Sequence, residues 1–283
     1  MRRRGITTTA LVCAVAAAAV GTVAARADAT PRWAPASKAT IHPGVRTFTS
    51  GGDQCRTGFV FYDAHAVYLS QAPWCSDELP LGTPVKIEGA SRPGRLVYNS
   101  WLTMERVGEA IRGNDFALVR IDNADRGRVN PSVPFWGGPV GDGGRSSLGG
   151  RVYTYGNSEV YCWEDDCPRE SSPAGVNTLS PRLGIDIGTP CELHVVPSPC
   201  GLLAPRDGGW THSIYTVAPG VSGDQGSAVL DERGRALGIL GYPWHTTTDM
   251  VTDLPKAMAY MKATTSLDAI KLATGTTPFS VPR

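Results

Sequence analysis

The stretch Gly223-Asp224-Gln225-Gly226-Ser227-Ala228-Val229-Leu230-Asp231 is the most informative part of the chain. Its first four residues have the form Gly-Asp-x-Gly, which is typical of a tight turn because glycine tolerates positive φ. The apolar run that follows is typical of a buried strand, and a second such run, residues 236–240, comes shortly after it. The stretch therefore predicts a turn that leads into a pair of strands.

Short apolar runs broken by turn residues recur on both sides of this stretch. Before a glycine-rich segment they occupy residues 58–62, 67–69, 84–88, 95–98 and 116–121, and after it residues 151–155, 183–187 and 213–216. The spacing becomes helical only near the end, at Leu254, Ala257, Met258 and Met261, with Asp253 placed to cap the helix. We therefore predict an all-β chain of two tandem antiparallel β-barrels with a C-terminal α-helix.

The predicted boundaries follow from these runs. Residues 30–45 are expected to form an irregular N-terminal segment, 46–136 the first barrel, and 137–150 a glycine-rich linker. Residues 151–245 are expected to form the second barrel, and 246–283 the helix and tail.

Composition excludes several classes of protein. The chain has 283 residues, of which 41% are hydrophobic, so a sizeable core is expected. Charged residues make up 19% and the net charge is +1, so no basic excess indicates nucleic acid. After residue 29 no apolar run approaches the roughly 20 residues of a membrane helix. We expect a monomer that needs no cofactor.

Residues 1–29 have the features of an export signal. Arg2, Arg3 and Arg4 precede an apolar segment at residues 6–23, and Ala27-Asp28-Ala29 fits a small-x-small cleavage site. The alternative is a membrane anchor, but threonines and a glycine interrupt the apolar segment. Cleavage would remove four arginines and one aspartate and change the net charge from +1 to −2. We predict a secreted, extracellular protein with no membrane contact after cleavage.

The cysteines support the same location. One of the seven lies in the predicted signal, and an even number remains, which in an exported chain indicates three disulfides. The alternative is a zinc site, but the spacings fit zinc only loosely, so we expect no metal. The six cysteines are Cys55, Cys75, Cys162, Cys167, Cys191 and Cys200.

Four segments in order resemble the trypsin-like serine proteases, in particular their bacterial secreted branch. The opening stretch resembles the nucleophile loop Gly-Asp-Ser-Gly-Gly, flanked by similar segments at 215–220 and 238–241. Residues 114–119 resemble the segment that carries the catalytic aspartate, and Cys55 to Cys75 resembles the disulfide beside the catalytic histidine. The resemblance covers residues 45–245 and implies a chymotrypsin-like double barrel with a Cys55–Cys75 disulfide. For the other cysteines we expect the local pairs Cys162–Cys167 and Cys191–Cys200.

The same resemblance indicates a degenerate catalytic triad. Trp74 stands at the histidine position, Gln225 at the serine position, and only Asp115 is retained. An indole N–H donates but does not take up a proton near neutral pH, and a carboxamide is a poor nucleophile. We therefore expect little or no hydrolysis by the family mechanism.

Further positions carry over from the resemblance. Gly223, Asp224 and Gln225 would form the oxyanion loop, and Pro219, Gly241 and Tyr242 would line the specificity pocket. Proline at the base of the pocket provides no carboxylate for a lysine or arginine substrate. Asp224 matches the aspartate that organises the loop, and a buried arginine is one possible partner that the sequence does not identify.

Three readings of function remain open. The leading one is a secreted pseudoprotease that binds a protein or peptide in its former substrate cleft. The second is an active hydrolase with an unorthodox site, for which Ser222, Ser227 and His245 are the nearest candidates, His65 being expected at a hairpin tip. The third is a structural secreted domain without a functional cleft.

Overall fold

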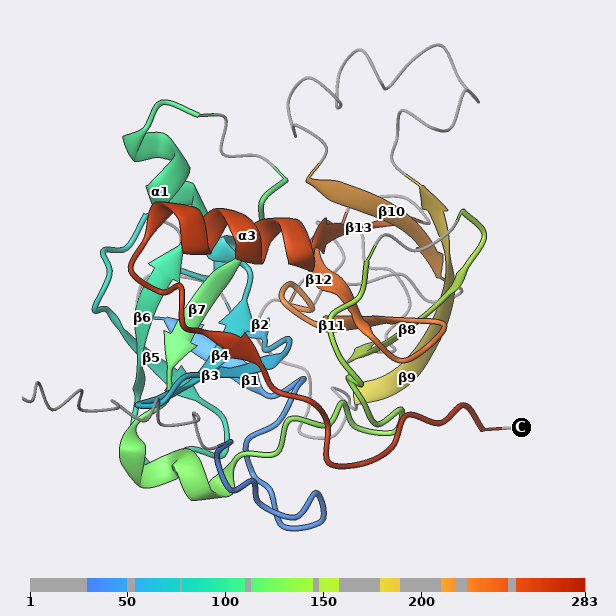
Figure 1. Cartoon of the computed structure of the whole chain (residues 1–283), viewed down its shortest axis with the longest axis horizontal. Helices are drawn as coiled ribbons and strands as arrows, with labels where there is room; N and C mark the ends of the chain where they lie inside the picture. The colour runs from blue at the N-terminus through green and yellow to red at the C-terminus, as the bar shows by residue number, and fades with distance from the viewer. Residues whose placement is uncertain are drawn as a thin grey trace, which may run out of the picture.

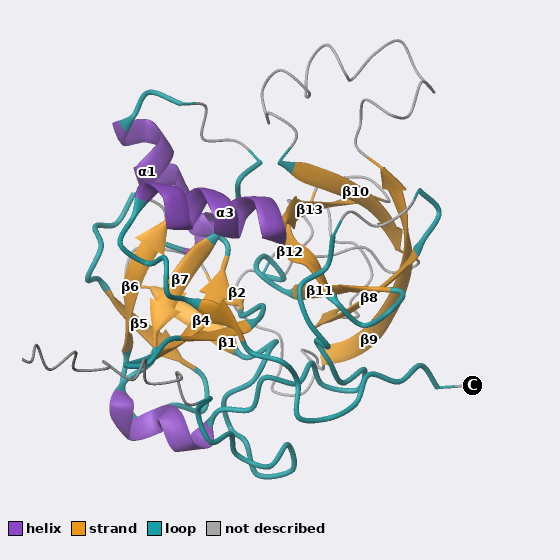
Figure 2. Ribbon diagram, in the orientation of Figure 1, coloured by secondary structure: helices purple, strands orange, loops and turns teal. Residues whose placement is uncertain are grey.

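Two curled antiparallel sheets lie side by side, and a C-terminal helix lies across the first (Figure 1). The computed structural model describes residues 30–49, 54–76, 78–109, 113–144, 148–157, 179–188, 210–216, 223–243 and 248–282. Figure 2 shows that strands and loops dominate this part of the chain. The predicted all-β architecture of two barrels and one C-terminal helix is confirmed.

The first sheet contains eight strands in the order β14-β3-β4-β7-β6-β5-β1-β2. They are β1 (Arg46–Thr49), β2 (Gln54–Arg56), β3 (Val60–Tyr62), β4 (Val67–Gln71), β5 (Pro84–Ile87), β6 (Gly94–Asn99), β7 (Ala117–Arg120) and β14 (Lys271–Leu272). Inward-facing residues such as Leu69, Leu96 and Val119 are fully buried and form its core. His65 lies in the turn between β3 and β4, at the predicted hairpin tip.

The second sheet is a closed barrel in the order β10-β13-β12-β11-β8-β9, completed by pairing of β9 with β10. Its strands are β8 (Arg151–Asn157), β9 (Leu179–Gly188), β10 (Thr211–Thr216), β11 (Ala228–Asp231), β12 (Ala236–Pro243) and β13 (Thr248–Asp253). Val152, Val229 and Leu240 belong to its small core. β13 lies beyond the predicted boundary at residue 245, so the barrel extends to Asp253.

Two helices have caps that explain their positions. The predicted C-terminal helix is confirmed as α3 (Leu254–Thr264), where the Asp253 carboxylate accepts from the Lys256 N–H and the helix buries Leu254 and Met261. Helix α1 (Ser100–Arg106) was not predicted; it begins where the Asn99 side chain accepts from the backbone N–H groups of Trp101 and Leu102. Within the described residues, two 3₁₀ segments, η1 (Pro73–Cys75) and η2 (Asn123–Arg128), are the other helical elements.

The C-terminal tail joins the two barrels. β14 pairs with β3 of the first sheet, and the chain then runs along residues 136–139 between the barrels (Figure 1). Its Phe279 ring packs edge-on against Tyr153 of the second barrel, with ring centroids 5.4 Å apart. No helix in the described part of the chain is long and apolar enough to span a membrane.

Candidate functional site

Gln225 lies in the turn that precedes β11, and its side chain folds back onto that turn. The side chain is almost fully buried, with 3% of the residue exposed. Its Oε1 atom accepts a hydrogen bond from the backbone N–H of Gly223 at 2.7 Å. The two glycines of the turn have φ of +95° and +94°, which a residue with a side chain rarely adopts. The Gln225 carboxamide therefore takes up the hydrogen bond that the Gly223 backbone N–H could otherwise donate to a ligand.

Gly226 also brings this turn against the first barrel. A Cβ atom at Gly226 would lie 2.2 Å from the carbonyl oxygen of Arg56 and 3.0 Å from the backbone nitrogen of Ala72. The Arg56 N–H donates in turn to the Gln225 carbonyl at 3.0 Å. Because η1 begins directly after Ala72, the turn lies beside the segment that carries Trp74.

Trp74 is the middle residue of η1, and 37% of it is exposed. The preceding Pro73 starts this short helix with a fixed φ. A disulfide between Cys55 and Cys75 ties η1 to β2, as the resemblance implied. The position that the resemblance assigns to a histidine thus carries an exposed indole on a covalently anchored loop.

Asp115 is buried just before β7, where its carboxylate accepts from the indole of Trp101. The Trp101 Nε1 to Asp115 Oδ1 distance is 3.0 Å, and the backbone N–H of Asp115 donates to Thr252 Oγ1 at 3.1 Å. Burial raises the pKa of Asp115 to about 6, and the hydrogen bond from Trp101 partly opposes this shift. The buried Asp115 carboxylate therefore accepts its hydrogen bond from a neutral donor, the Trp101 indole.

The other side of this carboxylate faces β12. A Cβ atom at Gly241 would lie 2.5 Å from Asp115 Oδ2, so glycine is needed there for the two barrels to approach. Thr252 Oγ1 also donates to the Gly113 carbonyl at 3.1 Å, which links β13 to the loop before Asp115. Asp115 thus lies at the junction of the barrels.

Asp224 forms a buried ion pair with Arg182 of β9. The Nη2 to Oδ2 distance is 3.3 Å, and the side chains are 2% and 0% exposed. A Cβ atom at Gly156 would lie 2.1 Å from Arg182 Nη2, so β8 packs directly on this pair. Arg182 is thus a buried arginine partner of Asp224, one that the sequence alone did not identify.

Several predicted positions lie outside the described residues. They are Pro219, Ser222, His245 and the cysteines Cys162, Cys167, Cys191 and Cys200. Tyr242 is described only as part of the backbone of β12. Within the described ranges, no group of three or more His, Cys, Asp or Glu side chains could hold a metal ion.

Two residues of the site were missed by the sequence analysis. Trp101 comes two residues after the end of β6, at Asn99. Only the recognition of Asn99 as a helix N-cap could have predicted that Trp101 lies on a helix. Arg182 is a charged residue on the inward face of β9, whereas Leu183 and Ile185 on the other face are exposed. A strand with an apolar outer face and charges inside is a signal for a buried ion pair.

Comparison with known proteins supports the architecture. No protein-family model matches the chain, and no curated protein matches it. Among solved structures, protease A of Thermobifida fusca superposes with a TM-score of 0.50 at 16% identity, covering 84% of this chain and all of the protease. A chymotrypsin from Cellulomonas bogoriensis has a TM-score of 0.46 at 16% identity, covering 83% of this chain and 98% of its own.

The first of these likenesses and the observed strand order agree on one fold. The chain has the two-barrel fold of the chymotrypsin-like serine proteases.

Proposed function

We propose that this chain is a secreted homologue of the trypsin-like serine proteases that does not hydrolyse peptides and acts by binding a protein or peptide in its former substrate cleft. The observation that carries the proposal is the hydrogen bond from the Gly223 N–H to Gln225 Oε1 at 2.7 Å. By the resemblance, this N–H is a donor of the oxyanion hole. A side chain of the chain itself takes up that donor, so a substrate oxyanion would have to displace it.

The neighbouring positions support the same reading. Gln225 offers no hydroxyl or thiol for acyl transfer, and Trp74 offers no nitrogen that can take up a proton near neutral pH. Asp115, which would orient an imidazole, instead accepts from the indole of Trp101. The aspartate is thereby bound to a donor that takes no part in proton transfer.

Binding is supported by the exposure of Trp74. A large aromatic side chain with 37% exposure, on a loop held by a disulfide and next to the Gln225 turn, is suited to contact a ligand at little entropic cost. Export is supported by the N-terminal sequence and by the disulfide, which persists in oxidising compartments. Mass spectrometry of the mature protein from culture medium should find an N-terminus at or near residue 30.

The test uses the mature chain and a mixture of unmodified peptides. The protein is immobilised, incubated with the mixture, and eluted peptides are identified by mass. We expect retained peptides to be eluted intact, and we expect Trp74→Ala to release most of them. A matched control, Leu81→Ala, removes another exposed apolar side chain of the first barrel, 53% exposed, and should leave retention unchanged. Cleaved peptides would contradict the loss of hydrolysis, and equal retention by all three proteins would contradict binding at the cleft.

A further inference from the structure

A small cavity lies where the C-terminal helix, the tail that follows it and the linker between the barrels meet. Its volume is about 200 Å³. The residues that line it are Gly141, Asp142, Met258, Lys262, Lys271 and Leu272. None of them belongs to the Gln225 turn, to η1 or to the contacts described for Asp115. The cavity is therefore separate from the candidate functional site.

Backbone hydrogen bonds hold all three walls of this cavity. In the linker, the Ala236 N–H donates to the Gly141 carbonyl at 2.9 Å and the Gly143 N–H donates to the Ala236 carbonyl at 2.7 Å. Asp142 thus lies between two bonds to β12, in a parallel bridge with Ala236. The second wall, β14, is paired with β3, and the two lining residues of α3 lie one turn apart on the same face of the helix. The lining side chains therefore project from ordered backbone.

The lining combines apolar side chains with charges of opposite sign. Met258 is 8% exposed and belongs to a hydrophobic cluster shared by both barrels, against which Leu272 packs. Lys262 brings a positive charge to the cavity, and Asp142 brings a negative charge. A ligand that matches this lining has an apolar group together with charged groups of both signs.

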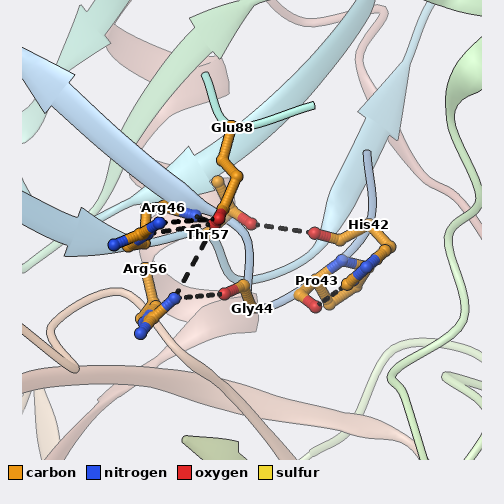
Figure 3. Close-up of polar contacts among 7 residues, drawn as sticks. All are labelled: His42, Pro43, Gly44, Arg46, Arg56, Thr57 and Glu88. Carbon is orange, nitrogen blue, oxygen red and sulfur yellow. Dashed lines mark hydrogen bonds and ion pairs between the residues drawn. The ribbon is translucent and has the colours of Figure 1, made fainter. Parts of the chain in front are cut away.

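Opposite charges on the surface of the first barrel meet directly instead. Figure 3 shows the Glu88 carboxylate turned toward Arg46, with 2.9 Å between Arg46 Nη2 and Glu88 Oε1, although the two side chains are 40% and 35% exposed. Within the described part of the chain, Lys262 and Asp142 line one cavity without forming such an ion pair. The cavity thus keeps two opposite charges apart, and a ligand that carries both signs can contact each of them.

We infer that this cavity binds a free amino acid with a small apolar side chain, such as leucine. Lys262 binds the carboxylate, Asp142 binds the ammonium group, and Met258 contacts the hydrocarbon side chain. The volume corresponds to about six or seven waters of the liquid, which is too small for a nucleotide. A peptide C-terminus has the carboxylate without the ammonium group beside it, so it matches only part of the lining. The inference holds whether or not the former substrate cleft binds a peptide.

The test is a titration of the full mature chain with leucine, read by saturation-transfer NMR. We expect saturable binding with a dissociation constant of about 1 mM, because a ligand of this size gains little free energy per atom. Two truncated ligands are titrated beside it: 4-methylpentanoate, which lacks the ammonium group, and 3-methylbutylamine, which lacks the carboxylate. N-acetyl-leucine stands in for a peptide C-terminus. Each of the three should bind about fivefold or more weakly than leucine.

Two variants assign the charged contacts. Asp142→Asn and Lys262→Gln should each weaken leucine binding about fivefold or more. Asp142→Asn should bind 4-methylpentanoate no more weakly than the parent, and Lys262→Gln should bind 3-methylbutylamine no more weakly, whereas a folding defect would weaken every ligand alike.

The matched control is Asp268→Asn, which neutralises an exposed carboxylate that does not line the cavity and should leave leucine binding unchanged. Absence of saturable leucine binding would overturn the inference, as would leucine binding that either cavity variant retains in full. Equal binding of leucine and N-acetyl-leucine would also overturn it, because the ammonium group would then play no part.

Discussion

Replacing Asp115 with asparagine should stabilise the protein at neutral pH and remove part of its pH dependence. The carboxylate is buried, and its described neighbours are the Trp101 indole and Gly241, neither of which carries a charge. Burial raises the pKa from 3.8 to about 6. Asparagine keeps an oxygen that can accept from Trp101 and carries no charge at any pH.

The magnitude follows from the two pKa values. Because the folded protein binds the proton more tightly than the unfolded chain, the stabilising effect of the protonated carboxyl is complete below pH 3.8 and is lost as the pH rises through about 6. A difference of about two pKa units corresponds to about 3 kcal/mol between pH 4 and pH 7. For a protein of this size that is roughly 6–12 °C in Tm.

The assay is a series of thermal and urea melts between pH 4 and pH 8 on the parent, Asp115→Asn and Asp268→Asn, whose carboxyl is exposed. The difference between parent and Asp115→Asn should grow in favour of the variant as the pH rises from 4 to 7. Asp268→Asn should follow the parent at every pH. A difference between parent and Asp115→Asn that does not change with pH would refute the reasoning.

Four further variants test other contacts. The double variant Trp74→His/Gln225→Ser should show weak or no esterase activity, because the Trp101 indole still donates its hydrogen bond to the Asp115 carboxylate. Adding Trp101→Leu to it should raise the rate at which a fluorophosphonate labels the protein. Full esterase activity of the double variant would contradict this reasoning. Gly226→Ala should lower Tm or prevent soluble expression, because φ is +94° and the new Cβ would meet the Arg56 carbonyl; an unchanged melt would contradict the packing. Truncation after Ile270 should lower the urea midpoint of both barrels, because the removed tail pairs with β3 and packs on the second barrel, whereas an unchanged midpoint would show that the tail contributes nothing.

Local pattern was sufficient for most of the fold. Apolar runs bounded by turns located most strands of both barrels, but not β1, β2 or β14, and Asp253 with the spacing of Leu254 and Met258 located α3. β13 was missed because Thr248–Asp253 contains polar residues at most positions, and its burial comes from neighbours on both sides in the closed barrel. Whether such a polar segment forms a strand depends on its pairing with segments that are distant in the sequence, and local periodicity holds no information on that pairing.

The candidate site divides along the same line. The positions of Trp74, Asp115 and Gln225 came from short motifs, which survive in the sequence as local patterns. The contacts that define their chemistry could not be predicted from such motifs. Trp101 reaches Asp115, and Arg182 reaches Asp224, only through the folded arrangement of the strands. The destination of the Gln225 side chain is likewise a property of the turn geometry, where the positive φ of Gly223 directs its N–H toward Oε1.

The central claim is that this site does not carry out serine acyl transfer, and intact-mass spectrometry after incubation with a fluorophosphonate tests it most directly. The purified mature chain and an active trypsin-like protease are treated side by side with excess reagent, and the masses are recorded over time. We predict that the active protease gains one adduct while the mass of this chain stays unchanged. A stoichiometric adduct on this chain, mapped to any serine, would contradict the account.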